Sequence, residues 1–100
     1  MNINNSLVVS NTNDILQAIS EQAHKLQTVA IVYENSTDGL VWRETEPYEI
    51  KKEIKLGKQV AKYYGYDVEK ADHIRCFNVE YILGACPLPN NFVPRWEIKL

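Results

Sequence analysis

The chain has 100 residues, of which 45% are hydrophobic and 24% are charged, and its formal net charge is −2. A chain of this length forms one domain with a single core and needs no metal or disulfide to support it. The weak negative charge argues against a broad surface that follows nucleic-acid phosphates, because such surfaces depend on many Lys and Arg contacts.

The sequence shows no export signal, and no apolar run approaches the ~18 residues that a membrane-spanning helix needs. We therefore expect a cytoplasmic protein that does not bind membranes. In that compartment its two cysteines, Cys76 and Cys86, are expected to be free thiols.

Residues 1–27 are expected to form an N-terminal segment with one amphipathic helix. Asp14 and Gln17 fit a capping box, and apolar residues recur at helical spacing after them. These apolar residues are Ile15, Leu16, Ile19, Ala23 and Leu26. One face of the helix should therefore pack against a core.

From residue 28 onward the hydrophobic period changes to two, and β-branched and aromatic residues become frequent, which indicates strands. Turn residues at 35–39 predict a hairpin, and Gly57 predicts a second reversal. Pro47 lies within the second strand and must occupy an edge, a bend or a bulge. We expect strands at 28–33, 40–50, 58–66, 73–83 and 93–100, a turn at 67–72 and a loop at 84–91.

One helix followed by about five short strands, with no helix between strands that is long enough for a parallel crossover, predicts a mainly β, antiparallel fold. We expect residues 28–100 to form a small, strongly bent five-stranded barrel. Side chains fill the interior of such a small barrel, so a ligand would bind on a face, at a mouth or between subunits.

Sites for catalysis or metal binding are weakly indicated. His73 and Cys76 have an H-x-x-C spacing, but on a strand they point to opposite faces, and Cys76 is typical of a small core residue. Glu44 and Glu46 share a strand face and are expected to lie at the surface or to pair with neighbouring lysines. The sequence therefore favours a protein that is not an enzyme and holds no metal or other cofactor.

A basic stretch occupies residues 51–62, where five lysines accompany a single acidic residue, Glu53. The favoured interpretation is a solvated strand whose charges prevent edge-to-edge pairing, and the alternative is a local basic patch. In the next few residues, alternation sends Tyr63 to one face and Tyr64 to the other. One of them can fill the barrel while the other offers stacking surface.

The most specific pattern joins Arg43 and Glu46-Pro47 with a later strand that carries Arg75 and Phe77. Further members of the pattern are Ile31, Tyr33, Tyr66, Asp67, Val79 and Ile82. Their order and spacing resemble the WYL domain, which has an R-x-x-E-P strand followed by an R-x-F-x-L-x-x-I strand. The Trp-Tyr-Leu motif itself is absent, because residues 61–63 read Ala-Lys-Tyr.

The resemblance implies an Sm-like, SH3-type barrel that acts as a regulatory sensor module. It also implies an anionic ligand, such as a nucleotide or a nucleic-acid fragment, with Arg43 and Arg75 matching arginines of the family. WYL domains commonly follow a helix-turn-helix domain. Only one helix precedes the predicted barrel, so this chain alone is not expected to read DNA sequence.

Arg75 shares a strand face with Phe77 and lies at the beginning of the strand, which predicts a guanidinium near a barrel mouth. There it would bind an anion or form a structural ion pair with Glu46 or Asp67, and the sequence does not decide between the two. The residues predicted to bind the ligand are Arg43, Arg75, Lys62, His73 and Tyr64.

The alternative function belongs to another class, a small phage-type or defence-associated accessory protein that acts through protein–protein interaction. Its exposed strand and residues 92–96 would bind a partner or another copy. Self-association as a dimer or ring is expected because Phe92, Trp96 and Ile98 supply apolar surface in the predicted last strand.

Overall fold

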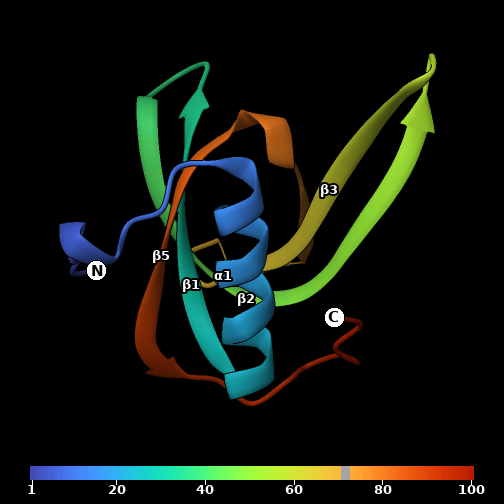
Figure 1. Ribbon diagram of the computed structural model, residues 1–100. Helices are drawn as coiled ribbons and strands as arrows, with labels where there is room; N and C mark the ends of the chain where they lie inside the picture. Colours follow the sequence, from blue (N-terminus) through green and yellow to red (C-terminus); the bar gives the residue numbers. More distant parts are fainter. Residues whose placement is uncertain (71–72) are drawn as a thin grey trace.

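A computed structural model describes residues 1–70 and 73–100 (Figure 1). Its elements are η1 (Asn5–Leu7), α1 (Thr12–Lys25), β1 (Gln27–Asn35), β2 (Gly39–Lys55), β3 (Lys58–Asp67), β4 (Ile74–Asn78), η2 (Val79–Tyr81) and β5 (Ile82–Asn91). η1 and η2 are single 3-10 turns. The strands form one antiparallel sheet in the order β4-β3-β2-β1-β5, which confirms the mainly β fold with one N-terminal helix.

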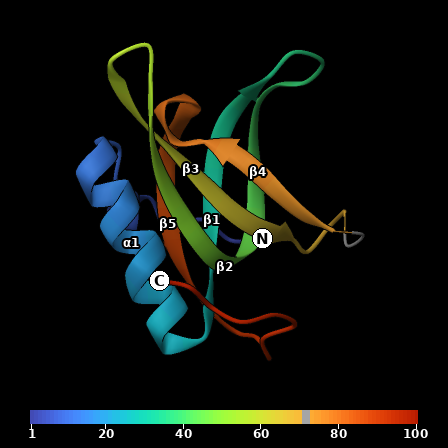
Figure 2. The ribbon, with the colours of Figure 1, turned by 90° about the vertical axis from the view of Figure 1, so that its right-hand side faces the viewer.

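The sheet is curved, and α1 lies against its concave side, here called the inner face; the opposite side is the outer face (Figures 1 and 2). The β1–β2 and β2–β3 hairpins extend beyond the body of the molecule in the same direction, and their tips stand apart in both views. No helix in the described part of the chain is long and apolar enough to cross a membrane.

The helix begins earlier than predicted. Asn11 is the N-cap, because its Oδ1 accepts from the backbone N of Asp14 at 2.9 Å and its Nδ2 donates to Asp14 Oδ2 at 2.6 Å. The predicted capping box of Asp14 and Gln17 is therefore wrong. Leu26 was assigned to the apolar face but ends the helix as an exposed left-handed residue with φ 56°.

The main core lies between α1 and the inner face of the sheet, as the amphipathic pattern predicts. It contains Ile15, Ile19, Val29, Ile31, Tyr63, Val79, Ile82 and Ala85. Two smaller clusters lie on the outer face. Ala30, Cys86 and Leu88 are covered by Ile3 and Val8, whereas Tyr48, Tyr66 and Phe92 pack with Val68, Ile74 and Ile98. The sheet is thus covered on both faces.

The hairpin at 35–39 is confirmed, since Asn35 pairs with Gly39. Of the three positions expected for Pro47, an edge, a bend or a bulge, the structure shows the bulge: the β2–β3 register shifts between Pro47 and Glu49. Alternation places Tyr48 on the outer face with Glu46, and the bulge keeps Glu49 on that face too, so Ile50 returns to the inner face opposite Tyr63. β2 then continues to Lys55 instead of ending at Ile50.

The predicted strand at 73–83 is present only in part, because it is divided into β4 at 74–78 and the start of β5 at 82–83 by η2. Pairing with β3 stops at Asn78, whose Oδ1 accepts from the backbone N of Glu80 at 3.2 Å and starts η2. This cap interrupts the apolar alternation. The predicted turn at 67–72 is present at 68–70, and its last two residues lie outside the described part of the chain.

The predicted loop at 84–91 is wrong, because these residues form most of β5. β5 is an edge strand that pairs with β1, and an edge accommodates Pro87 and Pro89, which lack the N–H that a central strand would need. Residues 93–100 are not the predicted strand. With Phe92 they form a covering segment on the outer face, which meets the sheet where the backbone N of Lys99 donates to the Tyr48 carbonyl at 2.7 Å.

Both cysteines are free thiols. Cys86 is buried, but Cys76 is exposed, which contradicts the prediction that it fills the core. The register explains the difference, since Cys76 lies opposite Tyr64 on the outer face. Among residues 1–70 and 73–100, no group of three or more His, Cys, Asp or Glu side chains is placed to hold a metal ion.

Candidate anion-binding site

The two predicted arginines lie on the same face of the sheet. Thr45 pairs with Asp67, and Gly65 pairs with Arg75. Arg43 is two residues from Thr45, and Asp67 is two residues from Gly65, so alternation places all of these residues on the inner face. Asp67 on β3 therefore lies between Arg43 on β2 and Arg75 on β4.

Arg43 is engaged by carboxylates. Its Nη1 donates to Glu69 Oε2 at 2.7 Å, and its Nε lies 3.8 Å from Asp67 Oδ2. Burial opposes the positive charge, but the Tyr33 hydroxyl and the two carboxylates outweigh it and raise the pKa of the guanidinium. Arg43 thus connects β2 to the turn that follows β3.

Asp67 also organises that turn. Its Oδ1 accepts from the backbone N of Glu69 at 3.0 Å and from that of Lys70 at 3.3 Å. The other oxygen, Oδ2, is buried and makes no hydrogen bond within the described residues. Its nearest cation is Arg43, so Asp67 is the ion-pair partner of Arg43 and not of Arg75.

Arg75 has a different environment. Its Nε is buried and has no hydrogen-bond partner among residues 1–70 and 73–100. Neither of the proposed ion-pair partners is available, since Asp67 faces Arg43 and Glu46 lies 3.2 Å from Arg95 Nε. A buried donor without an acceptor is costly, and native proteins seldom leave one. Such a donor is a candidate for contact with a ligand.

Aromatic rings line the inner face beside Arg75. Phe77, which follows it on the same face of β4, packs against Tyr33 with 5.3 Å between ring centroids and stacks on Tyr63 at 5.8 Å. The Thr45 hydroxyl gives its hydrogen to the Val29 carbonyl at 2.9 Å. The fully buried Tyr63 hydroxyl must therefore donate to Thr45 Oγ1, at 2.7 Å, and burial raises its pKa. These contacts hold the rings in place on the face of the sheet that carries Arg75.

Two of the other predicted ligand residues, Lys62 and Tyr64, lie on the opposite face of the sheet from the arginines. Lys62 and Tyr64 lie on the outer face, because they alternate with the inward Tyr63 and Gly65. Lys51 covers Tyr64, with 5.3 Å from its Nζ to the ring centroid. His73 precedes β4 and is exposed. The five predicted residues do not form one cluster, and only Arg43 and Arg75 share a face of the sheet.

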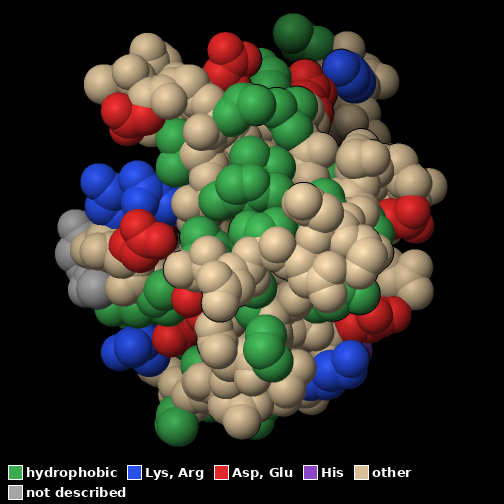
Figure 3. All heavy atoms as spheres, turned by 90° about the vertical axis from the view of Figure 1, so that its left-hand side faces the viewer, with side chains coloured by type: hydrophobic (Ala, Val, Ile, Leu, Met, Phe, Trp, Pro, Cys, Tyr) green, Lys and Arg blue, Asp and Glu red, His purple; other side chains and the backbone are tan. Residues whose placement is uncertain are grey.

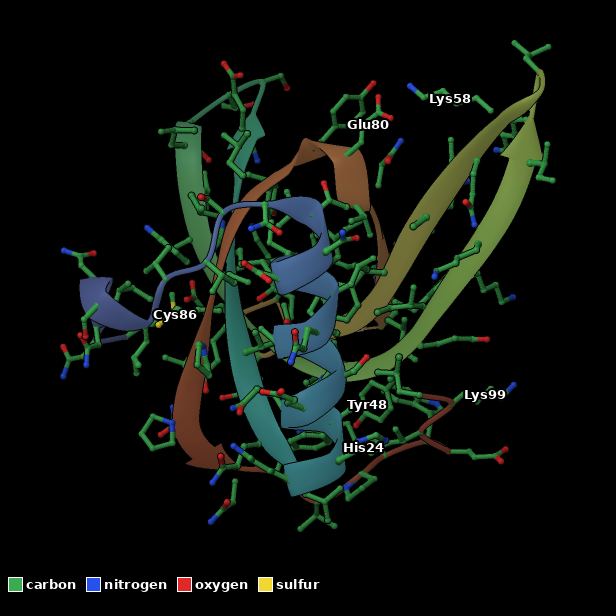
Figure 4. The ribbon with its side chains drawn as sticks, in the orientation of Figure 1. His24, Tyr48, Lys58, Glu80, Cys86 and Lys99 are labelled. Carbon is green, nitrogen blue, oxygen red and sulfur yellow. The ribbon has the colours of Figure 1, made fainter. Side chains whose placement is uncertain are left out.

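A charge cluster around the buried Glu46 on the outer face was not found by the sequence analysis. The Tyr48 hydroxyl donates to Glu46 Oε1 at 2.7 Å and accepts from the backbone N of Arg95 at 3.0 Å. The Arg95 guanidinium pairs with Glu46 and lies 4.4 Å from the Tyr66 ring centroid. Figure 4 shows Tyr48 beside the covering segment that carries Lys99. Glu46 is thus buried and paired, contrary to the prediction of a surface glutamate beside lysines.

The sequence contains little that would predict this cluster, because Arg95 and Glu46 are far apart in the chain and do not belong to one motif. The prediction that Phe92, Trp96 and Ile98 leave apolar surface uncovered holds only for Trp96, which is 45% exposed, whereas Phe92 and Ile98 pack in the outer-face cluster. Phe92 is buried against Tyr48, and Trp96 packs edge-on against the same ring at 5.4 Å.

Comparison with known proteins bears on the fold. No family model matches the sequence, and no curated protein matches it significantly. Among solved structures, the chain is similar to proteasome accessory factor B/C (PafBC) of Arthrobacter aurescens, with a TM-score of 0.65 and 16% sequence identity. The fold is WYL-like.

The match with PafBC covers 80% of this chain and 12% of the PafBC chain. At this identity the likeness shows the fold alone. It supports the WYL-like fold that the two arginine-bearing strands suggested. It carries no information about a ligand.

Proposed function

We propose that this chain is a regulatory module that binds an anionic ligand of nucleotide or nucleic-acid type in the cytoplasm, and that it acts by binding and not by catalysis. The observation that carries the proposal is the buried Nε of Arg75, which has no hydrogen-bond partner among the described residues. The WYL-like fold supports a regulatory role through the family resemblance.

The charges around the site limit how an anion would bind. Arg43 and Arg75 each have a buried Nε without a hydrogen-bond partner among the described residues, but the charge of Arg43 is balanced by Asp67 and Glu69, so Arg75 is the arginine of the pair that we assign to the anion. A guanidinium can hold a phosphate through two parallel N–H donors. We therefore expect binding through a single arginine, with a slope of about one when log Kd is plotted against log salt concentration.

The test is calorimetric titration of the protein with mononucleotides, cyclic nucleotides and short oligonucleotides. Arg75→Ala should weaken the binding of the best of these about 10- to 150-fold, the loss expected for one charge-assisted hydrogen-bonding group. Arg75→Lys should recover part of the loss, because it restores the charge without the planar fork.

Lys55→Ala is the matched control, since it removes one positive charge from the exposed end of β2, and it should leave affinity within about twofold. An equal loss in both variants would place binding on the lysines of the hairpin. Unchanged binding by Arg75→Ala, together with a clearly lower melting temperature, would make Arg75 a structural residue and reject the proposal.

A second candidate function is protein–protein interaction. Apolar side chains are exposed at both hairpin tips and on η2, among them Leu40, Leu56 and Tyr81. This surface differs from the segment at 92–96 that the sequence predicted as the binding surface. The charged residues around it indicate which partner it suits.

A further inference from the structure

One end of the molecule carries opposite charges on its two sides. The β2–β3 hairpin, residues 51–62, is here called the arm and contains five lysines and one glutamate. The acidic side chains of Glu34, Asp38 and Glu80 belong to the β1–β2 hairpin and to η2. Both hairpins extend in the same direction (Figure 1), so the basic and acidic groups lie at the same end of the molecule.

The tip of the arm is apolar and strained. Leu56 is fully exposed, and Ile54 is 79% exposed. Leu56 also has a φ of 53°, in the left-handed region that favours Gly, Asn and Asp in a two-residue hairpin turn. A leucine at this position therefore costs backbone energy and gains no packing within its own chain.

The lysines of the arm also oppose one another. Lys51 lies directly across from Lys62, and Lys55 from Lys58. Like charges at directly opposite positions destabilise a hairpin. Lys58 reaches Glu80 at 3.4 Å (Figure 4), and Lys55 reaches Glu53 at 3.7 Å, but all four side chains are exposed, so these ion pairs compensate little. An acidic surface that met the arm would relieve the repulsion.

Such a surface exists on the same molecule. A hollow of about 360 Å³ lies between the β1–β2 hairpin and η2, lined by Glu34, Ser36, Glu80, Tyr81 and Leu83. Tyr81 is 65% exposed. Figure 3 views this side of the molecule and shows hydrophobic side chains with acidic side chains next to them toward its upper end. The hollow thus combines apolar walls with two carboxylates.

We propose that the arm of one copy binds the hollow of a second copy, which makes a symmetric dimer with two reciprocal contacts. Leu56 would enter between Tyr81 and Leu83, while Lys55 and Lys58 would meet Glu34 and Glu80. In a dimer with twofold symmetry each arm would meet the other copy's hollow, so one symmetry operation would satisfy both contacts.

The charges favour a second copy over an anionic membrane or a nucleic acid. Either of these would be attracted by the arm but repelled by Glu34, Asp38 and Glu80 at the same end of the molecule. Phosphates would also make no use of the exposed leucine. A second copy satisfies the lysines, the carboxylates and the apolar tip together. The inference does not depend on ligand binding by Arg75.

The first test uses Leu56→Asn and sedimentation velocity over a wide range of protein concentration. Asn removes the apolar side chain and tolerates the left-handed turn, so the variant should fold with an unchanged or higher melting temperature. We expect its dimer dissociation constant to rise about 10- to 100-fold, the loss for one buried leucine. Val93→Asn, which changes an 86% exposed residue of the covering segment, should leave dimerisation unchanged.

The second test exchanges charges. One variant carries Lys55→Glu and Lys58→Glu, and the other carries Glu34→Lys and Glu80→Lys. Each variant alone should be a monomer, because its arm and hollow repel. An equimolar mixture should form a heterodimer, since each arm then meets a hollow of opposite charge.

Several results would overturn the proposal. They are a wild-type protein that stays a monomer at all concentrations, a mixture of the two charge variants that stays monomeric, and a dimer that Val93→Asn disrupts while Leu56→Asn does not. A monomer whose arm lysines are needed for binding to phosphatidylserine vesicles or to an oligonucleotide would assign the arm to that partner instead.

Discussion

Gly65 lies at the position where the Tyr63 ring passes over β3. A Cβ atom on Gly65 would lie 2.6 Å from the Tyr63 hydroxyl oxygen and 2.7 Å from Cζ, which is closer than such atoms approach in proteins. Gly65→Ala should push the ring away and separate the hydroxyl from Thr45. We expect a loss of about 1–3 kcal/mol in the free energy of unfolding, measured by urea denaturation.

Gly84→Ala provides the control for this prediction. A Cβ at Gly84 would meet Val32 Cγ1 at 3.2 Å, a milder contact that a small side-chain movement relieves. Its stability loss should be clearly smaller. Equal losses in the two variants would mean that the Tyr63 ring is not the cause.

Tyr48 makes stability depend on pH in alkaline solution. Burial, with the neighbouring Glu46 carboxylate, raises the pKa of its hydroxyl from 10.0 to about 12. Between these values the native state holds a proton that the unfolded chain has lost, so stability is full below pH 10 and falls as the pH rises toward 12. Urea denaturation at pH 9 and at pH 11 should show a lower free energy of unfolding at the higher pH.

Tyr48→Phe should reduce the difference between the two pH values, because the titrating hydroxyl is gone. The buried Tyr63 hydroxyl also has a raised pKa, so part of the alkaline loss should remain in this variant. An unchanged pH dependence in Tyr48→Phe would show that Tyr48 does not contribute to it.

Among the contacts between elements, those of Arg95 hold the covering segment against the outer face of the sheet. Arg95 pairs with Glu46, which is only 4% exposed, and it lies over the Tyr66 ring. Arg95→Ala would leave the buried carboxylate without its cation. Because the Arg95 side chain is half exposed, solvent screening reduces the loss, and we expect about 1–2 kcal/mol by urea denaturation.

Lys99→Ala removes a charge from the same segment and should change stability by less than about 0.5 kcal/mol, since its contact with the sheet uses the backbone N. A similar loss in both variants would point to the charge of the segment as a whole. It would contradict the specific role of Arg95.

The sequence was most informative about elements where local preferences and the final fold agree. The hairpin at 35–39 and the bulge at Pro47 follow from turn and proline chemistry within a few residues. The failures lie where a tertiary position decides the outcome. Pro87 fits β5 only because this strand is at the edge of the sheet, a place in the fold that no local pattern reveals.

The candidate site was predictable only in part. The family pattern selected Arg43 and Arg75, and the sheet places both on the inner face. Their different surroundings depend on Glu69 and Asp67, whose approach to Arg43 requires the β3 turn to fold against β2. Alternation along β3 predicts that Lys62 and Tyr63 point to opposite faces of the sheet. Which of these faces is the inner one follows only from the strand pairing and the bulge in the structure.

At the scale of the whole molecule, the sheet is covered on both faces by different parts of the chain. The helix covers the inner face, whereas segments before α1 and after β5 cover clusters on the outer face. Val9 also pairs with the edge strand through two backbone hydrogen bonds to Ala85, each of 2.9 Å. The sheet therefore obtains its second layer from short segments and not from a second helix.

The strand order also determines how the chain must find its native state. β1, β2 and β3 are joined by tight turns, so their pairings can form early and at small entropic cost. β5 returns to β1, bringing Ile31 beside Ala85, and this closure spans all the intervening strands, so it carries a larger entropic cost. We therefore expect a three-stranded nucleus of β1, β2 and β3, with the docking of β5 as a later step.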